Sequence, residues 1–198
     1  PEIYLNEMRL IKSEFEINRM RKATQISAEA HELVRESISS KKNERQIQGI
    51  LEGFFLEKGA RGPAYNSIVA SGDNACILHY TSNNSPLKKG DLLLVDAGCS
   101  LTDYYNGDIT RTIPISGKFS KEQKIIYEIV LSAQKNAIKS AVKGSNSSAI
   151  HNVALTVLIE GLKDIGLLTG STEKIIENQS YKHLYMHRTG HWLGLDVH

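Results

Sequence analysis

The sequence predicts an α+β fold in which helices and strands follow one another in two successive groups. Four segments repeat apolar residues at helical spacing, and the stretches between them hold short apolar runs separated by glycine, proline and asparagine. The predicted order is helix, helix, strands, then helix, helix, strand. Because the two halves do not align as sequences, we expect a repeat of architecture only.

The composition is that of an ordinary globular domain. The chain has 198 residues, of which 40% are hydrophobic and 23% are charged. No apolar run is long enough to predict a membrane span, and a net charge of +2 argues against nucleic acid as a partner. The two cysteines, Cys76 and Cys99, form neither a zinc pattern nor a disulfide framework. We therefore expect a cytoplasmic protein.

Two helices are predicted in the first half. The first covers residues 13–39, and Ser13 with Glu16 makes a capping box at its start. The second begins after Asn43 and ends at Gly59. The apolar face of the first helix consists of Ile17, Met20, Ala23, Ala30, Val34 and Ile38.

Short strands are predicted after the second helix. Turn signals around residues 72, 83–86 and 88–90 separate them. The candidate strands are residues 67–70, 76–80, 91–95 and 108–115.

The helical pattern returns in the second half. Ser120 and Gln123 make another capping box, which starts a helix that ends at Gly144. A further helix covers residues 148–165, and residues 184–198 resemble a strand. A strand without a partner is a poor terminus, so we expect the rest of a sheet to lie beyond this sequence.

Two aspartates lie at the ends of candidate strands. Asp96 closes an apolar run, and Asp108 follows an Asn-Gly pair. Each by itself is also typical of a turn. If the strands pair about Thr102, the two carboxylates lie opposite one another on one face of the sheet. Since two adjacent carboxylates repel unless a proton or cation lies between them, the pair predicts a divalent metal site.

The histidines near the end of the chain are spaced in a suggestive way. His183, His187 and His191 are four apart, but the segment lacks the glutamate of the helical zinc-protease motif, and its glycines favour extended chain. His191 and His198 would face opposite sides of a regular strand, and Gly194 permits a bend that brings them to one side. Three histidines are expected to be ordinary surface residues: His31, His151 and His183.

Four ordered motifs resemble those of the Xaa-Pro aminopeptidases (aminopeptidase P), which are pita-bread metallopeptidases. The motifs are Ile77-Leu78-His79-Tyr80, Val95-Asp96-Ala97-Gly98-Cys99, Gly107-Asp108-Ile109-Thr110-Arg111-Thr112, and Met186-His187 followed by His191-Trp192-Leu193-Gly194-Leu195-Asp196-Val197-His198. The likeness covers nearly the whole chain, including residues 59–61 and 65–69. One departure is that eleven residues separate the two aspartates, one more than in the bacterial pattern. We expect the extra residue within 100–106, as a longer turn or a bulge.

The resemblance implies a pita-bread fold, with two helix-and-hairpin halves around a curved, mainly antiparallel sheet and an incomplete second half. Residues 1–12 would be a linker from a missing N-terminal domain. Residues 13–198 would be a partial catalytic domain that lacks its C-terminal strands.

The resemblance also implies a metal site with two divalent ions. Asp96 would bind one ion, Asp108 would bridge both and His191 would bind the other. Two glutamate ligands would lie beyond residue 198. Carboxylates with a single imidazole suit manganese, with zinc and cobalt as alternatives. Because three ligands are a poor site for two ions, the chain by itself is expected to be inactive.

The implied reaction releases an N-terminal residue that precedes proline, by attack of a hydroxide that bridges the ions. His198 would donate to the scissile carbonyl or to the tetrahedral intermediate. His79 would contact the substrate around the scissile bond, and His187 would shape the proline pocket or relay protons. The partners would be peptides with proline at the second position. A homo-oligomer is one possible state of the full-length protein, whose oligomeric state stays open at the level of sequence.

Two alternative functions stay open at the level of sequence. Prolidases, which cleave Xaa-Pro dipeptides, also tend to carry a glycine like Gly190 before the histidine, whereas residues 192–195 and the His79-Tyr80 pair favour the aminopeptidase. A non-catalytic pita-bread binding module is the other alternative. Such modules usually lose the metal ligands, and all three that this chain could contain are present.

Overall fold

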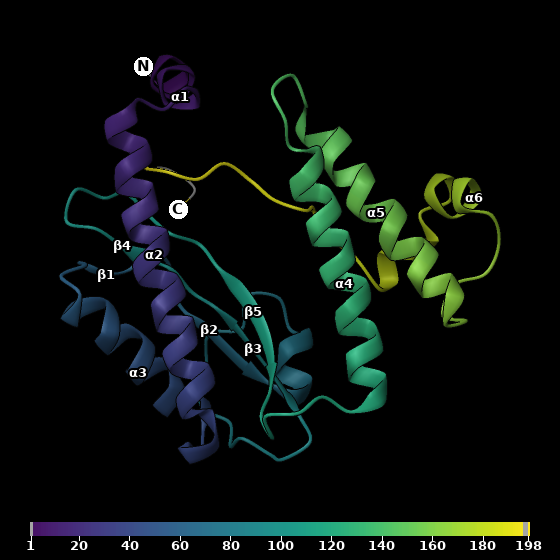
Figure 1. Cartoon of the computed structure of the whole chain (residues 1–198), viewed down its shortest axis with the longest axis horizontal. Coiled ribbons are helices and arrows are strands. Elements are labelled where there is room, and N and C mark those ends of the chain that lie inside the picture. Colours follow the sequence, from purple (N-terminus) through teal and green to yellow (C-terminus); the bar gives the residue numbers. More distant parts are fainter. Residues whose placement is uncertain (1, 196–197) are drawn as a thin grey trace. The chain divides into compact units, whose positions relative to one another are not determined.

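The computed structural model describes residues 2–195 and residue 198. The chain divides into two compact units, each described by itself: residues up to 119 together with residues from 192 onward, and residues 120–191 (Figure 1). The assignment of residues 1–12 as a linker stays a prediction. None of the described helices is long and apolar enough to cross a membrane.

The two long helices of the first unit begin where the capping residues predict. The helical segments of this unit are α1 (Glu2–Leu10), α2 (Glu14–Ser37), the 3-10 turn η1 (Ile38–Ser40) and α3 (Glu44–Glu57). The predicted capping box of Ser13 and Glu16 is confirmed at the start of α2. The side chain of Asn43 caps α3 by accepting from the Gln46 N–H. The helix α1, which buries no residue, was not predicted.

The strands of the first unit form two small antiparallel sheets. They are β1 (Gly62–Pro63), β2 (Ile68–Ser71), β3 (Leu92–Asp96), β4 (Cys99–Ser100) and β5 (Thr110–Pro114). One sheet has the order β2-β3-β5, and the other pairs β1 with β4. The three-stranded sheet thus has β3, which carries Asp96, at its centre.

The predicted strand over residues 76–80 is wrong. Cys76 is the last residue of a 3-10 helix, η2 (Gly72–Cys76), and residues 77–79 form a bend and turn. His79 has a φ of 54°, in the left-handed region, which an extended strand excludes. Residues 76–78 are apolar but exposed, so their apolar composition did not indicate a buried strand.

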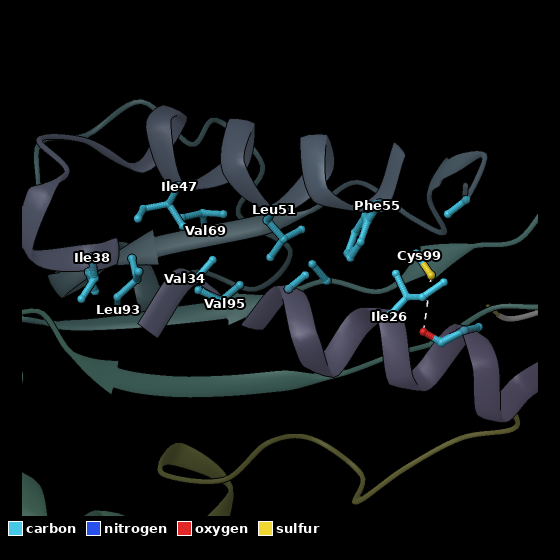
Figure 2. Close-up of a cluster of buried hydrophobic side chains, with 14 of the residues drawn as sticks. Ile26, Val34, Ile38, Ile47, Leu51, Phe55, Val69, Leu93, Val95 and Cys99 are labelled. Atoms are coloured by element: carbon cyan, nitrogen blue, oxygen red, sulfur yellow. Dashed lines mark hydrogen bonds between the residues drawn. The ribbon is translucent and has the colours of Figure 1, made fainter. Parts of the chain in front are cut away.

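The core of the first unit lies between helices α2 and α3 and one face of the three-stranded sheet (Figure 2). Leu93 and Val95 of β3 point into this core and are almost wholly buried. By alternation, Leu94 and Asp96 face the other side of the sheet. The labelled core residues in Figure 2 are Ile26, Val34, Ile38, Ile47, Leu51, Phe55, Val69, Leu93, Val95 and Cys99.

The second unit is helical. It contains α4 (Lys121–Ser140), α5 (Ser147–Asp164), α6 (Thr172–Glu177) and the 3-10 turn η3 (Ser180–His183). The predicted capping box of Ser120 and Gln123 is confirmed. Gly161 lets α5 approach α4, because a Cβ at this position would lie 2.6 Å from a methyl carbon of Ile129.

The strand predicted for residues 184–198 is wrong wherever the structure describes it. Residues 184–195 form turns and irregular chain rather than a strand, while residues 196–197 lie outside the described part. Alternating apolar residues become a strand only beside a partner strand, and residues 184–195 take part in none of the strand pairings that the structure describes.

Candidate metal centre

The hairpin that carries both aspartates is antiparallel, but its register differs from the prediction. Asp96 pairs with Thr110 rather than with Asp108. The ladder continues past the strands, since the Gly107 N–H donates to the Cys99 carbonyl at 3.0 Å. The predicted pairing is therefore wrong by two residues. A shift of two keeps every side chain on the same face, so both aspartates still lie on one side of the hairpin.

The chain reverses direction between the two aspartates in a turn at residues 101–105. Leu101 and Tyr105 are joined by a 2.9 Å backbone hydrogen bond, and the Tyr104 N–H donates to the Leu101 carbonyl at 2.9 Å. Tyr104 has a φ of 71°. Since Ser100 and Asn106 pair in the same register as β3 and β5, the hairpin keeps one register up to this turn, and the place of the extra residue stays a prediction.

Two glycines let this hairpin pack tightly. A Cβ at Gly98 would lie 1.7 Å from the Gly107 carbonyl oxygen and 2.8 Å from the Asp108 nitrogen. A Cβ at Gly107 would lie 2.6 Å from the Ser27 hydroxyl of α2. Glycine is therefore needed at both positions. The motifs around the aspartates thus allow a close approach of the backbone as well as supplying the carboxylates.

Tyr65 meets both aspartates through its hydroxyl group. Its oxygen lies 2.7 Å from Asp96 Oδ1 and 2.6 Å from Asp108 Oδ1. The chain bulges here: from Pro63 to Ile68 it advances five residues while the opposite strand, from Cys99 to Asp96, moves three. Such a bulge re-aims a side chain out of the regular alternation, and here it presents the phenol to the two carboxylates.

The electrostatics at this point favour a cation. Burial raises the pKa of the Tyr65 phenol, and the hydrogen bond to Asp108 and the charge of Asp96 raise it further. The phenol therefore keeps its proton. The two negative groups repel unless something positive lies between them. Hard carboxylate oxygens suit a divalent ion such as manganese, so the residues present fit the predicted metal.

His198 lies beside this cluster. Its ring centroid is 4.2 Å from that of Tyr65, and one of its nitrogens is within 4.8 Å of an Asp108 carboxylate oxygen. The bend expected at Gly194 is confirmed: its φ is 149°, and its N–H donates to the His198 carbonyl at 2.8 Å. The Gly194 carbonyl accepts from the Asn106 N–H, which ties this segment to the hairpin.

His187 and His191 are exposed residues of the second unit. Within that unit their segment is fastened to α5, because His151 Nδ1 lies 2.8 Å from the Thr189 hydroxyl and the His151 ring stacks on Tyr185. His151 is thus half-buried and not the surface residue that the sequence suggested. The roles of His187 as a catalytic residue and of His191 as a metal ligand stay predictions.

Two further histidines differ in their environments. His79 is exposed on the turn after η2, and its catalytic role stays a prediction. His31, expected at the surface, is 9% exposed, because it lies on the face of α2 that packs against the sheet. Burial lowers the pKa of its imidazole. Nε2 of the neutral ring lies 3.0 Å from the Ala97 carbonyl oxygen and can donate a hydrogen bond to it.

Tyr65 was not among the site residues expected from the sequence. It is 31 positions from Asp96 and 43 from Asp108. A local sequence pattern cannot predict a contact between residues so far apart in the chain. Its only signal was its place in one of the segments, residues 65–69, that carry the family resemblance.

Comparison with known proteins shows which family the chain resembles. The sequence profile of metallopeptidase family M24 matches residues 18–198. The chain is 49% identical to an Xaa-Pro aminopeptidase of Haemophilus influenzae over 194 residues, which cover 98% of this chain and 45% of that protein. It is 40% identical to the Xaa-Pro aminopeptidase of Escherichia coli, with 98% and 44% covered. The chain therefore spans less than half the length of these relatives.

Solved structures share the fold. Aminopeptidase PepP of Pseudomonas aeruginosa superposes with a TM-score of 0.90 at 45% identity, covering 96% of this chain and 43% of that one. A variant of Escherichia coli aminopeptidase P in complex with substrate gives a TM-score of 0.90 at 39% identity, with the same shares covered. A zinc-substituted form of the same enzyme, in complex with product, is equally similar. The α+β, pita-bread fold of aminopeptidase P is thus confirmed, and the chain belongs to metallopeptidase family M24.

Proposed function

We propose that this chain carries part of the active site of a metal-dependent Xaa-Pro aminopeptidase. The observation that supports this most directly is the convergence of Asp96 and Asp108 on the single hydroxyl of Tyr65. The similar proteins of Haemophilus influenzae and Escherichia coli are named Xaa-Pro aminopeptidases. The proposed substrates are peptides with proline at the second position.

The proposed ligands in this chain are Asp96, Asp108 and His191, with Asp108 shared by two ions. Manganese is the proposed metal, and two glutamates outside this sequence would complete the set. When bound, divalent ions lower the pKa of a water molecule and polarise a carbonyl group. Tyr65 would orient both aspartates through its hydroxyl, and its retained proton would limit their repulsion.

Three histidines of the chain would contact the peptide substrate. We assign His198 to the scissile carbonyl, where an imidazole N–H would stabilise negative charge as the carbonyl carbon becomes tetrahedral. Its place beside Asp108 and Tyr65 supports that role. His79 would contact the substrate around the scissile bond. His187 would shape the pocket for proline or relay a proton.

The aminopeptidase is favoured over a dipeptidase by the names of the relatives. Cleavage of a tripeptide or longer Xaa-Pro peptide, in preference to the dipeptide, would support this choice. The retention of all three possible ligands disfavours a non-catalytic binding module. A cytoplasmic location and a homo-oligomer of the full-length protein stay predictions.

The decisive variant is Asp108→Asn in the full-length protein. We expect it to lose tightly bound metal and Xaa-Pro cleavage together, by more than the roughly 10–100-fold typical of a residue that only supports a ligand. Bound metal is measured by mass spectrometry and cleavage by release of the N-terminal residue. Asp164→Asn, at the exposed end of α5, is the matched control. Retention of both metal and cleavage in Asp108→Asn would overturn the assignment.

A further inference from the structure

A second carboxylate of the first unit has an unusual environment. Glu44 lies in the first turn of α3 and is 0% exposed. Its two oxygens accept five hydrogen bonds of 2.8–3.0 Å. The donors are the Ser71 N–H, the Ser71 hydroxyl, the Asn74 amide, the Tyr80 hydroxyl and the Ser85 N–H.

These contacts keep the carboxylate ionised. Burial by itself raises the pKa of Glu44, but the hydrogen bonds from Asn74, Ser71, Ser85 and Tyr80 outweigh it, so that the pKa lies below its usual value. All of these donors are neutral groups. A buried charge that is satisfied by several fixed donors is rigid, because moving any donor leaves part of the charge without a partner.

All the donors come from one stretch of chain. Ser71 ends β2, Asn74 lies in η2, and Tyr80 and Ser85 follow. The backbone reinforces the arrangement, since the Glu44 N–H donates to the Ser85 carbonyl at 3.0 Å. Residues 72–85 therefore leave the sheet, pass around the Glu44 carboxylate and return to the start of α3.

His79 lies at the exposed turn of this stretch, directly before Tyr80. Its φ of 54° is costly for a residue other than glycine and persists only where the surroundings enforce it. The Tyr80 hydroxyl, 2.8 Å from Glu44 Oε2, is the anchor nearest to it in sequence. Asn83 adds a second anchor, since its side chain accepts from the Val69 N–H and donates to the Ser67 carbonyl.

We propose that Glu44 is a positioning residue that, through the Tyr80 hydroxyl, holds the loop 72–85 so that His79 is presented to the peptide substrate. This inference rests on the proposed function of His79. Glu44 itself touches no substrate, because its carboxylate is enclosed by the loop that it holds.

The test is Tyr80→Phe in the full-length protein, which removes one donor and keeps the ring. We expect kcat/KM for an Xaa-Pro tripeptide to fall by roughly 10-fold, in the range for supporting residues. Tyr105→Phe is the matched control, because it also removes a tyrosine–glutamate hydrogen bond, the one to Glu16 at 3.2 Å. The control should change kcat/KM less than 2-fold, a loss well below that range.

A double-mutant cycle with His79→Ala separates positioning from general stability. If Tyr80 acts through His79, the Tyr80→Phe loss disappears once His79 is already alanine, because the two effects are not additive. A loss of the same size in both backgrounds would overturn the proposal. Glu44→Gln should likewise lower kcat/KM in the wild-type background and not in the His79→Ala background. The reason is that the glutamine N–H₂ would face hydrogen-bond donors and could not accept from them.

Hydrogen exchange of residues 72–85 gives a readout that does not depend on activity. We expect faster exchange in this stretch for Tyr80→Phe and no change for Tyr105→Phe. Unchanged exchange would overturn the anchoring role. If the wild-type protein cleaves no Xaa-Pro peptide, the proposed function fails and the presentation of His79 to substrate fails with it, whereas the exchange result still decides whether Glu44 and Tyr80 hold the loop.

Discussion

The first unit contains two carboxylate clusters that differ in how their charge is satisfied. Glu44 accepts five hydrogen bonds from neutral donors and is wholly buried. Asp96 and Asp108 are half-buried and meet at one phenolic hydroxyl. The first arrangement fixes a loop and leaves no need for a cation. The second brings two negative groups together at one hydroxyl, and their mutual repulsion favours a metal ion between them.

Their construction differs as well. The Glu44 cluster collects donors from the end of β2 and from the loop that follows it, which wraps around the start of α3. The aspartate pair depends on a hairpin that packs backbone against backbone at Gly98 and Gly107. Changes at the hairpin should therefore have the larger effects.

The largest effect is expected for Gly98→Ala. The added Cβ would lie 1.7 Å from a backbone oxygen, so the hairpin would have to open. We expect a loss of about 3 kcal/mol or more in the free energy of unfolding, measured by urea denaturation, together with weaker metal binding. Gly49→Ala in α3, where nothing lies within 4 Å, should instead stabilise by about 0.5–1 kcal/mol. Similar losses in both variants would contradict the close-packing argument.

A smaller effect is expected for Tyr65→Phe. Without the hydroxyl, the aspartates lose the group that orients them, and metal affinity should fall by roughly 10–100-fold. A competition titration with a chelating dye measures this change, and Tyr105→Phe again serves as the control. Unchanged affinity would mean that Tyr65 does not position the aspartates.

The smallest effect is expected for Glu44→Gln, and it depends on pH. At pH 7 the variant should lose about 1–3 kcal/mol of unfolding free energy, the cost of poorly matched buried groups. Because the folded pKa of Glu44 is lowered, its contribution is complete above the unfolded value of about 4.3 and disappears as pH falls through the folded pKa.

The difference between wild type and Glu44→Gln should therefore shrink on acidification below about pH 4. Thermal melts over that range measure it, and Glu57→Gln at the exposed end of α3 is the control. A difference independent of pH would contradict the ionised state.

Much of the fold was predictable because its signals are local. The capping boxes at Ser13 and Ser120 start the helices that the sequence predicts. The strands around Asp96 and Thr110 also lie where the turn residues place them. The predicted strand over 76–80, and the one over 184–198 wherever it is described, were wrong, since an apolar pattern cannot reveal whether a partner strand exists.

The sequence by itself determined the two aspartates as a candidate metal pair, their common face and the bend at Gly194, because strand alternation and glycine conformation are local properties. Only the tertiary structure decided the register, in which Asp96 pairs with Thr110. The alternation of side chains between the two faces is the same after a shift of two residues, so it cannot distinguish the registers. It also brought Tyr65 to both carboxylates and wrapped residues 71–85 around Glu44. Such contacts join residues far apart in the chain, where no local pattern records them.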